Sequence, residues 1–119
     1  MTGVHLVKIF KVIGSCYKRQ AKLGDIVFVV VRGVDTSAHY LKDDRLKWKF
    51  RKGSVHWAII VHVRKWYRRR NLTYIRFPRN AVILITRKRM PFTKRLRFGV
   101  PKEIADRYPV IGSIAPKIY

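Results

Sequence analysis

The chain has 119 residues, with 28 Lys and Arg against 6 Asp and Glu, so that its formal net charge at pH 7 is +22. Repulsion among so many cations in a small volume favours a polyanionic partner, and nucleic acid offers the phosphates that a metabolite lacks. A hydrophobic content of 48% excludes a disordered basic tail, and the cations that interrupt every apolar stretch exclude a membrane span of about 18 to 20 residues.

Five short apolar runs bounded by turn residues predict β-strands. In chain order they cover residues 6–13, 26–31, 55–63, 74–77 and 81–85. The third run is the clearest, because the odd-numbered positions from Val55 to Val63 are apolar and alternate with the residues between them. This period of two is typical of a strand that buries one face. Turns are expected at Gly14, Gly24-Asp25 and Pro78 to Asn80.

A single helix is expected at residues 102–108. Pro101 suits a first helical turn, Glu103 favours the positive end of the helix, and Pro109 stops it. Short antiparallel strands followed by one late helix indicate a mainly β fold, a small closed antiparallel β-barrel, in which no sheet edge is exposed. A chain of this length builds one hydrophobic core, so residues 1–119 are expected to form a single domain.

Positive charge is concentrated in three of the expected connections. The first connection holds Lys42, Arg45, Lys47, Lys49, Arg51 and Lys52 around Trp48 and Phe50. The second holds Arg64, Lys65, Arg68, Arg69 and Arg70 beside Trp66 and Tyr67, and the third holds Arg87, Lys88, Arg89, Lys94, Arg95 and Arg97 around Met90, Pro91 and Phe92. Cations in such loops bind RNA phosphates, and aromatic rings stack on unpaired bases. One basic hairpin alone is more often a solvated loop with its rings in the core, but three loops of one sign favour nucleic acid.

An enzyme needs a constellation of reactive groups, and the sequence offers none. His56 and His62 lie six positions apart on one expected strand, about 20 Å, so they cannot share a metal ion. The adjacent Asp43 and Asp44 stand among cations and are expected to relieve local repulsion or to cap a turn. Cys16 lies beside Lys18 and Arg19 without a nearby His, which favours an incidental or buried thiol over a nucleophile. No catalytic residue, metal or cofactor is therefore expected, and Trp57 is expected in the core.

Six short motifs, in order, resemble the universal family of large-subunit ribosomal protein fourteen. They are Thr2-Gly3-Val4 through Lys11-Val12-Ile13-Gly14, Gly24-Asp25-Ile26, Arg51-Lys52-Gly53, Ile75-Arg76-Phe77 with Asn80-Ala81, Phe98-Gly99, and Ser113-Ile114-Ala115-Pro116. The resemblance runs along nearly the whole chain. It implies a five-stranded barrel with a basic hairpin and a short C-terminal helix, acting as a structural, non-enzymatic component of the large ribosomal subunit.

The resemblance also implies the partners. These are large-subunit rRNA, small-subunit rRNA across an intersubunit bridge, neighbouring large-subunit proteins, and a ribosome-silencing factor that blocks subunit joining. The residues expected to bind rRNA are Lys11, Lys18, Arg19, Lys47, Lys49, Arg51, Lys52, Arg64, Lys65, Arg68, Arg69, Arg70, Arg76, Arg79, Arg87, Lys88 and Arg89. By position, those expected at the intersubunit or protein-partner face are Lys94, Arg95, Leu96, Arg97 and Ser113.

Departures from the family pattern refine the expectation. The family's opening strand has no counterpart before Thr2, so an edge of the barrel is expected to be open or covered by a neighbour. The connection from Gly33 to Phe50 is longer than usual, and Arg79 and residues 87–97 add charge. A strongly basic, altered version of this kind indicates an organellar ribosome, above all a mitochondrial one whose own genome encodes the chain, which would explain the lack of a leader. Another organellar ribosome or a cytoplasmic one is the alternative.

Three readings from other classes remain as alternatives. A free-standing β-barrel that binds single-stranded nucleic acid would share the charge and the aromatic residues, but it does not explain the order of the motifs. A membrane-surface protein would need an amphipathic helix with a large apolar face, and the expected helix is short and mixed. An RNA-processing enzyme would need a general acid or base among scarce carboxylates and scattered histidines.

Overall fold

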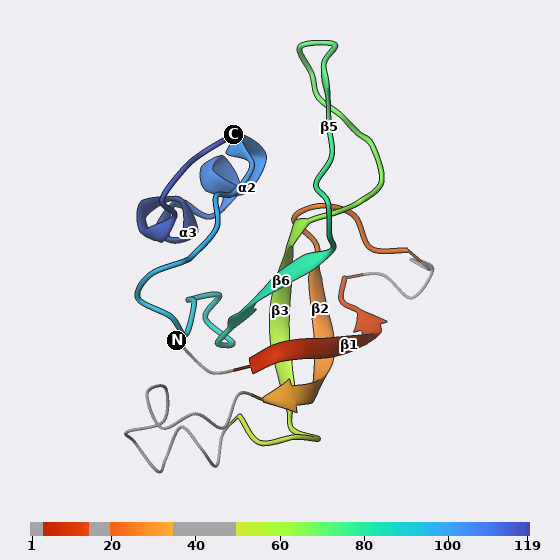
Figure 1. Cartoon of the computed structure of the whole chain (residues 1–119), viewed down its shortest axis with the longest axis vertical. Coiled ribbons are helices and arrows are strands. Elements are labelled where there is room, and N and C mark those ends of the chain that lie inside the picture. The colour runs from red at the N-terminus through yellow and green to blue at the C-terminus, as the bar shows by residue number, and fades with distance from the viewer. Residues whose placement is uncertain (1–3, 15–19, 35–49) are drawn as a thin grey trace.

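The computed structural model describes residues 4–14, 20–34 and 50–119 of the chain (Figure 1). The strands are β1 (Val4–Val12), β2 (Ile26–Val34), β3 (Val55–His62), β4 (Tyr67–Arg68), β5 (Tyr74–Ile75) and β6 (Ala81–Ile85). Two short helices follow, α2 (Lys102–Arg107) and α3 (Pro109–Ile114). The runs rich in Val and Ile form β1, β2, β3 and β6 within a few residues of the predicted bounds, as their β-branched composition indicates.

Four strands form one antiparallel sheet in the order β1-β2-β3-β6. The pairing of β2 with β3 runs from Ile26 opposite Ile59 to Val30 opposite Val55. Three register shifts interrupt the pairing of β1 with β2, and such bulges bend and twist a strand. Strand β1 accordingly crosses in front of β2 and β3 in Figure 1.

The mainly β class is confirmed, and the described residues form an antiparallel sheet of four strands and a second sheet of two, without a strand pairing that closes a five-stranded barrel. Within residues 4–14, 20–34 and 50–119, β1 pairs only with β2, and β6 pairs only with β3 among the strands. The predicted strand at 74–77 is shorter, and it pairs with β4, a segment that the sequence analysis placed in a loop. Strands β4 and β5 form a hairpin that is separate from the main sheet, so β5 is not one of the strands of that sheet.

Strand β3 is buried on both faces, so the prediction of one buried face is wrong. On one face Ile59 and Val61 pack with residues of the C-terminal segment, among them Ile104 and Ile111. On the other face Ala58 and Ile60 belong to a second buried cluster. Its other members are Val27, Val29, Phe50 and Leu84. The helices cover the first face, which leaves no solvent-facing positions for polar residues along Ala58–His62. Trp57 is partly buried against the first cluster, which agrees with its expected place in the core.

The C-terminal segment contains two helices where one was predicted. Pro109 ends α2, as expected, but it also begins α3 in its first turn, where a missing N–H costs nothing. The segment is held to the sheet through Gly24, whose carbonyl oxygen accepts a hydrogen bond of 3.1 Å from the Tyr108 hydroxyl. Gly24 has a φ of 86°, which glycine adopts readily, and the expected turn is closed by Asp25 Oδ2, which accepts a hydrogen bond from the Lys22 N–H at 2.6 Å.

No helix in the described part of the chain is long and apolar enough to cross a membrane.

Candidate nucleic-acid interface

The hairpin formed by β4 and β5 carries much of the exposed positive charge. It projects beyond the end of the sheet where β3 ends and β6 begins (Figure 1). Its turn is closed by the Arg69 N–H, which donates to the Thr73 carbonyl oxygen at 2.8 Å, and Leu72 adopts a φ of 67° at the tip. Leu72 is 74% exposed and Tyr74 59% exposed, so the hairpin presents apolar as well as cationic side chains to a partner.

Arg69 differs from its neighbours Arg68 and Arg70, because its guanidinium is used within the molecule. Its Nε lies 2.9 Å from Glu103 Oε1 of α2, and its terminal N–H group donates to the Tyr119 backbone oxygen at 2.7 Å. Arg68 and Arg70 are exposed, whereas Arg69 is half-buried. The structure therefore gives Arg69 the role of holding the hairpin against the C-terminal segment, and its binding to rRNA stays a prediction.

An aromatic platform lies at the base of the hairpin. The Cζ atom of Arg76 stands 4.5 Å from the centre of the Trp66 ring, within the range of a cation–π contact. Trp66 is 57% exposed. This pairing of a flat ring with a planar guanidinium offers both of the surfaces on which unpaired bases stack.

A second group of cations lies at the other end of the sheet. Arg51 and Lys52 stand in the turn before β3, and Arg87, Lys88 and Arg89 stand in the turn after β6. Antiparallel pairing puts these turns at the same end, because Trp57 near the start of β3 lies opposite Ile85 at the end of β6. Strand β3 has eight residues, about 26 Å, so the two groups of cations are separated by roughly that distance.

The two groups can be named by their position. The hairpin-end cations are Arg64, Lys65, Arg68, Arg70, Arg76 and Arg79, and the turn-end cations are Arg51, Lys52, Arg87, Lys88 and Arg89; all of them are exposed. Lys11, on β1, is also exposed. The predicted rRNA-binding residues Lys18, Arg19, Lys47 and Lys49 lie outside the described residues, as do Cys16, Asp43 and Asp44.

The residues predicted for the intersubunit or protein-partner face lie close together. The Leu96 N–H donates to the Ile114 carbonyl oxygen at 3.2 Å, which brings the segment at 94–97 beside the end of α3. Ser113 is exposed there, and its hydroxyl donates to the Val110 carbonyl oxygen at 2.7 Å. Lys94, Arg95 and Arg97 are exposed and Leu96 is half-buried.

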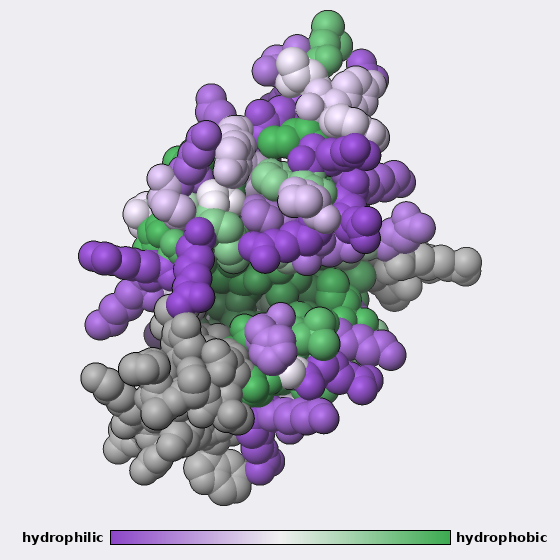
Figure 2. Space-filling model, viewed as in Figure 1, coloured by the Kyte–Doolittle hydropathy of each residue, from purple (hydrophilic) through white to green (hydrophobic). Residues whose placement is uncertain are grey.

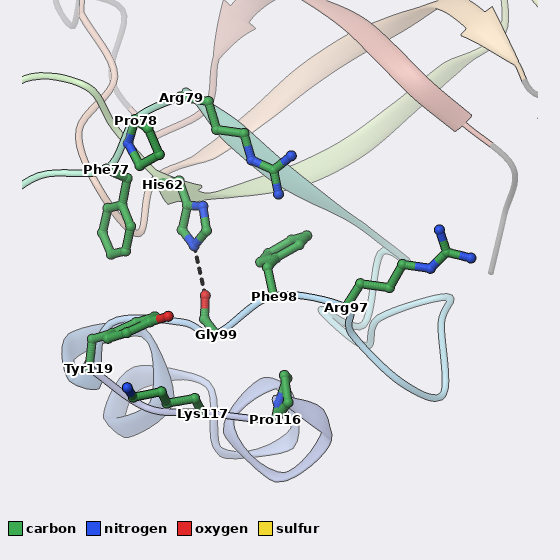
Figure 3. Close-up of a pocket in the computed structure, with 10 residues that line it drawn as sticks. All are labelled: His62, Phe77, Pro78, Arg79, Arg97, Phe98, Gly99, Pro116, Lys117 and Tyr119. Carbon is green, nitrogen blue, oxygen red and sulfur yellow. Dashed lines mark hydrogen bonds between the residues drawn. The ribbon is translucent and has the colours of Figure 1, made fainter.

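His62, at the end of β3, connects the sheet to the C-terminal segment (Figure 3). Its ring stacks on Phe77 with the centroids 4.1 Å apart and an angle of 4° between the planes. Its Nε2 lies 2.7 Å from the Gly99 carbonyl oxygen. Burial lowers the pKa of His62 below its usual value, the hydrogen bond to Gly99 opposes this, and the charge of Arg79 adds to the lowering. At neutral pH the ring is therefore uncharged, and Nε2–H is the donor to Gly99.

Gly99 permits the close packing of this region. A Cβ atom at position 99 would lie 2.5 Å from a ring carbon of Tyr119 and 2.7 Å from the Lys117 carbonyl oxygen. The segments at 97–100 and 117–119 are also joined by the Val100 N–H, which donates to the Lys117 carbonyl oxygen at 2.9 Å. The close approach explains why glycine stands at this position.

The buried His62 predicts a specific dependence of stability on pH. An unfolded histidine titrates near pH 6.5, and the folded pKa of His62 is lower, so between the two values the unfolded chain binds more protons. The contribution of His62 to the free energy of unfolding is full above about pH 6.5, and it is lost as the pH falls through the folded pKa. Urea unfolding of the protein from pH 7.5 to 5.5 is expected to show this loss, and H62Q is expected to lose less over the same interval. Parallel curves for the two proteins would contradict the assignment.

Sequence reasoning missed three features of this interface. It did not find the contact between Trp66 and Arg76, the ion pair of Arg69 with Glu103, or the packing role of His62. The spacing of Trp66 and Arg76 across an expected hairpin was a usable signal, because cross-strand neighbours contact each other. In the described ranges no cluster of three or more His, Cys, Asp or Glu residues could hold a metal ion.

Comparison with known protein families gives a match over the whole chain. The family model described as ribosomal protein L14p/L23e matches residues 1–119 of the chain.

Proposed function

The chain belongs to the ribosomal protein L14p/L23e family, and from this premise we propose how it binds its rRNA. Members of the family are structural, non-enzymatic rRNA-binding proteins of the large ribosomal subunit. The hairpin-end and turn-end cations contact separate segments of large-subunit rRNA, and the sheet fixes the distance between them. The observation that carries the proposal is the presence of exposed cations at both ends of one sheet. Phosphate contacts of this kind position a protein by the shape of the RNA, without reading its bases.

The segment at 94–97 and the end of α3 form the face toward the small subunit in this proposal. The backbone hydrogen bond between Leu96 and Ile114 supports this assignment, because it joins the segment at 94–97 to the end of α3 and so brings the predicted residues onto one surface. Lys94, Arg95 and Arg97 would contact small-subunit rRNA in a bridge, while Leu96 and Ser113 would contact a neighbouring protein or a ribosome-silencing factor. A mitochondrial ribosome is the proposed setting, on the ground of the net charge of +22.

The barrel closes, in this proposal, when an additional strand is seated between β1 and β6. A groove of about 1010 Å³ separates the two strands, and its lining includes Val4, Leu6, Val7, Val82 and Leu84. Leu6 is 57% exposed. Figure 2 shows hydrophobic atoms exposed in the middle of this face, with hydrophilic side chains around them. Among the described strands β1 pairs with β2 and β6 pairs with β3, and an apolar groove beside such outer strands favours the addition of a strand.

The hairpin gives the sharpest test of the proposal. Each phosphate contact that is lost lowers the slope of log affinity against log salt by about 0.7 to 0.9. The double variant R68Q/R70Q is therefore expected to lower the slope for binding to large-subunit rRNA by about 1.4 to 1.8 and to enter the subunit less efficiently. The far-ultraviolet circular dichroism of the variant should be unchanged, because Arg69 still holds the hairpin.

The control has the same change of charge in a different place. Lys8 and Lys22 are exposed and lie outside the predicted rRNA-binding set. K8Q/K22Q is expected to bind with nearly the slope of the unmodified protein. Equal slopes for R68Q/R70Q and the unmodified protein would remove the hairpin from the rRNA interface.

A further inference from the structure

A pocket of about 550 Å³ lies where three distant segments of the chain meet (Figure 3). His62 ends β3, Phe77 and Arg79 come from the connection between β5 and β6, and Tyr119 belongs to the C-terminal segment. Sites for small ligands have volumes of about 300 to 1,000 Å³, so one mononucleotide unit can be accommodated.

The walls of the pocket are aromatic. Phe77 stacks on His62 and stands edge-on to Tyr119, with ring centroids 5.9 Å apart and an angle of 68° between the planes. Phe98 lies on the other side of His62, at 4.8 Å between centroids. Tyr119 is 47% exposed, so part of its ring is accessible to a ligand. Flat, partly open rings of this kind are the surfaces on which single bases stack.

The rim of the pocket is positively charged. Arg79, Arg97 and Lys117 line it and are exposed, and the lining residues include no Asp or Glu. Arg79 lies over the Phe98 ring at 5.3 Å and Lys117 over the Tyr119 ring at 5.0 Å, so each cation stands beside an aromatic wall. Rings next to cations match a ligand that carries a flat heterocycle and a phosphate, and they match neither an apolar peptide nor a bare anion.

His62 supplies a polar atom that lacks a partner. Its side chain is 5% exposed, and Nδ1 is buried without a hydrogen bond among the described residues. Because Nε2–H donates to Gly99, Nδ1 of the neutral ring is an acceptor. Buried acceptors are rarely left unpaired, and the amino group of a base is a donor of suitable size.

We propose that this pocket receives one unstacked, amino-bearing nucleotide of rRNA, with its base against the exposed part of the Tyr119 ring and its phosphate against Arg79, Arg97 or Lys117. The proposal rests on the rRNA binding proposed above. The rRNA interface otherwise binds phosphates, and the pocket would add one contact to a base. At that position the protein would therefore prefer adenine, cytosine or guanine over uracil.

The test uses mononucleotides as probes. The purified chain is titrated with AMP, UMP or inorganic phosphate while the ring resonances of His62, Phe77 and Tyr119 are followed by NMR. AMP is expected to shift these signals and to bind about fivefold more tightly than UMP, which lacks the amino donor. Binding of phosphate with the affinity of AMP, or of UMP with the affinity of AMP, would overturn the proposal.

Two variants locate the binding. Y119A removes a wall while the backbone N–H of residue 119 still donates to the Val100 carbonyl oxygen, and it is expected to weaken AMP binding about tenfold. Y74A removes an exposed tyrosine of the hairpin, outside the pocket, and is expected to leave AMP binding unchanged. Equal losses in the two variants, or no loss in Y119A, would contradict the assignment.

The source of the nucleotide is decided with the RNA complex. If rRNA fills the pocket, the complex with large-subunit rRNA no longer responds to AMP, whereas a complex that still binds AMP would show that rRNA is not the occupant. Affinity for the complete rRNA is measured in parallel. A chain that binds rRNA but not AMP overturns only the pocket proposal, and a chain that does not bind rRNA overturns the proposed function.

Discussion

The affinity of the chain for large-subunit rRNA is expected to fall by about 10³ to 10⁵ between 50 and 200 mM monovalent salt. The reason is the release of counterions from each phosphate that a Lys or Arg neutralises. The hairpin-end and turn-end cations of the described residues number eleven, and about six to ten phosphate contacts produce a loss of this size. Filter binding or fluorescence anisotropy over a series of salt concentrations measures it.

The same series tests whether both ends of the sheet are used. Neutralising the turn-end cations Arg87 and Arg89 and neutralising the hairpin-end cations Arg68 and Arg70 should each lower the slope by a similar amount, and the combined variant should lower it by the sum, because the two ends do not touch. An affinity that is insensitive to salt would contradict the electrostatic account of binding.

The I104A variant is expected to lose about 2 to 5 kcal/mol of its free energy of unfolding. Ile104 of α2 is 1% exposed, and it packs with Ile59, Val61 and their neighbours on one face of the sheet. Truncation removes buried methyl groups and leaves a cavity that a close-packed interior fills only in part. Urea unfolding in a buffer of high ionic strength, which screens the repulsion among the cations, gives the free energy.

The control for this prediction is a truncation in the next helix. Val110 of α3 is 39% exposed, and V110A is expected to change the free energy of unfolding by no more than about 0.5 kcal/mol. I104A also weakens the docking of α2, which carries Glu103, the partner of Arg69. The backbone amides of the hairpin are therefore expected to exchange hydrogen faster in this variant. Similar stabilities for I104A and V110A would show that the C-terminal segment does not contribute to the core.

Local sequence patterns predicted the main strands because these segments carry their own signal. Val and Ile at positions 26–31, 55–63 and 81–85 have the side chains that suit a sheet, and glycine and Asp25 mark the turn before β2. Strand β5 lies within the predicted strand at 74–77, but β4 was assigned to a loop, because two residues are too few to show a period. Pro109 was ambiguous because the same residue ends one helix and can begin another.

The remaining features depend on contacts between distant residues. The burial of β3 on both faces follows from the docking of the C-terminal helices, and no pattern within residues 55–63 contains it. The pairing of Arg69 with Glu103 spans 34 positions, and the hydrogen bond of His62 to Gly99 spans 37. The sequence therefore indicated the charge and the class of partner, whereas the separation of the cations into two ends came only from the strand register.

Cosedimentation with the large ribosomal subunit tests the central claim most directly. A lysate from the organism that encodes the chain is separated on a sucrose gradient with magnesium retained, and the chain is followed by mass spectrometry beside markers of both subunits. The account predicts stoichiometric comigration with the large subunit and the monosome. Recovery at the top of the gradient, or dispersal among other RNA–protein particles, would contradict it and favour a free-standing module that binds single-stranded nucleic acid.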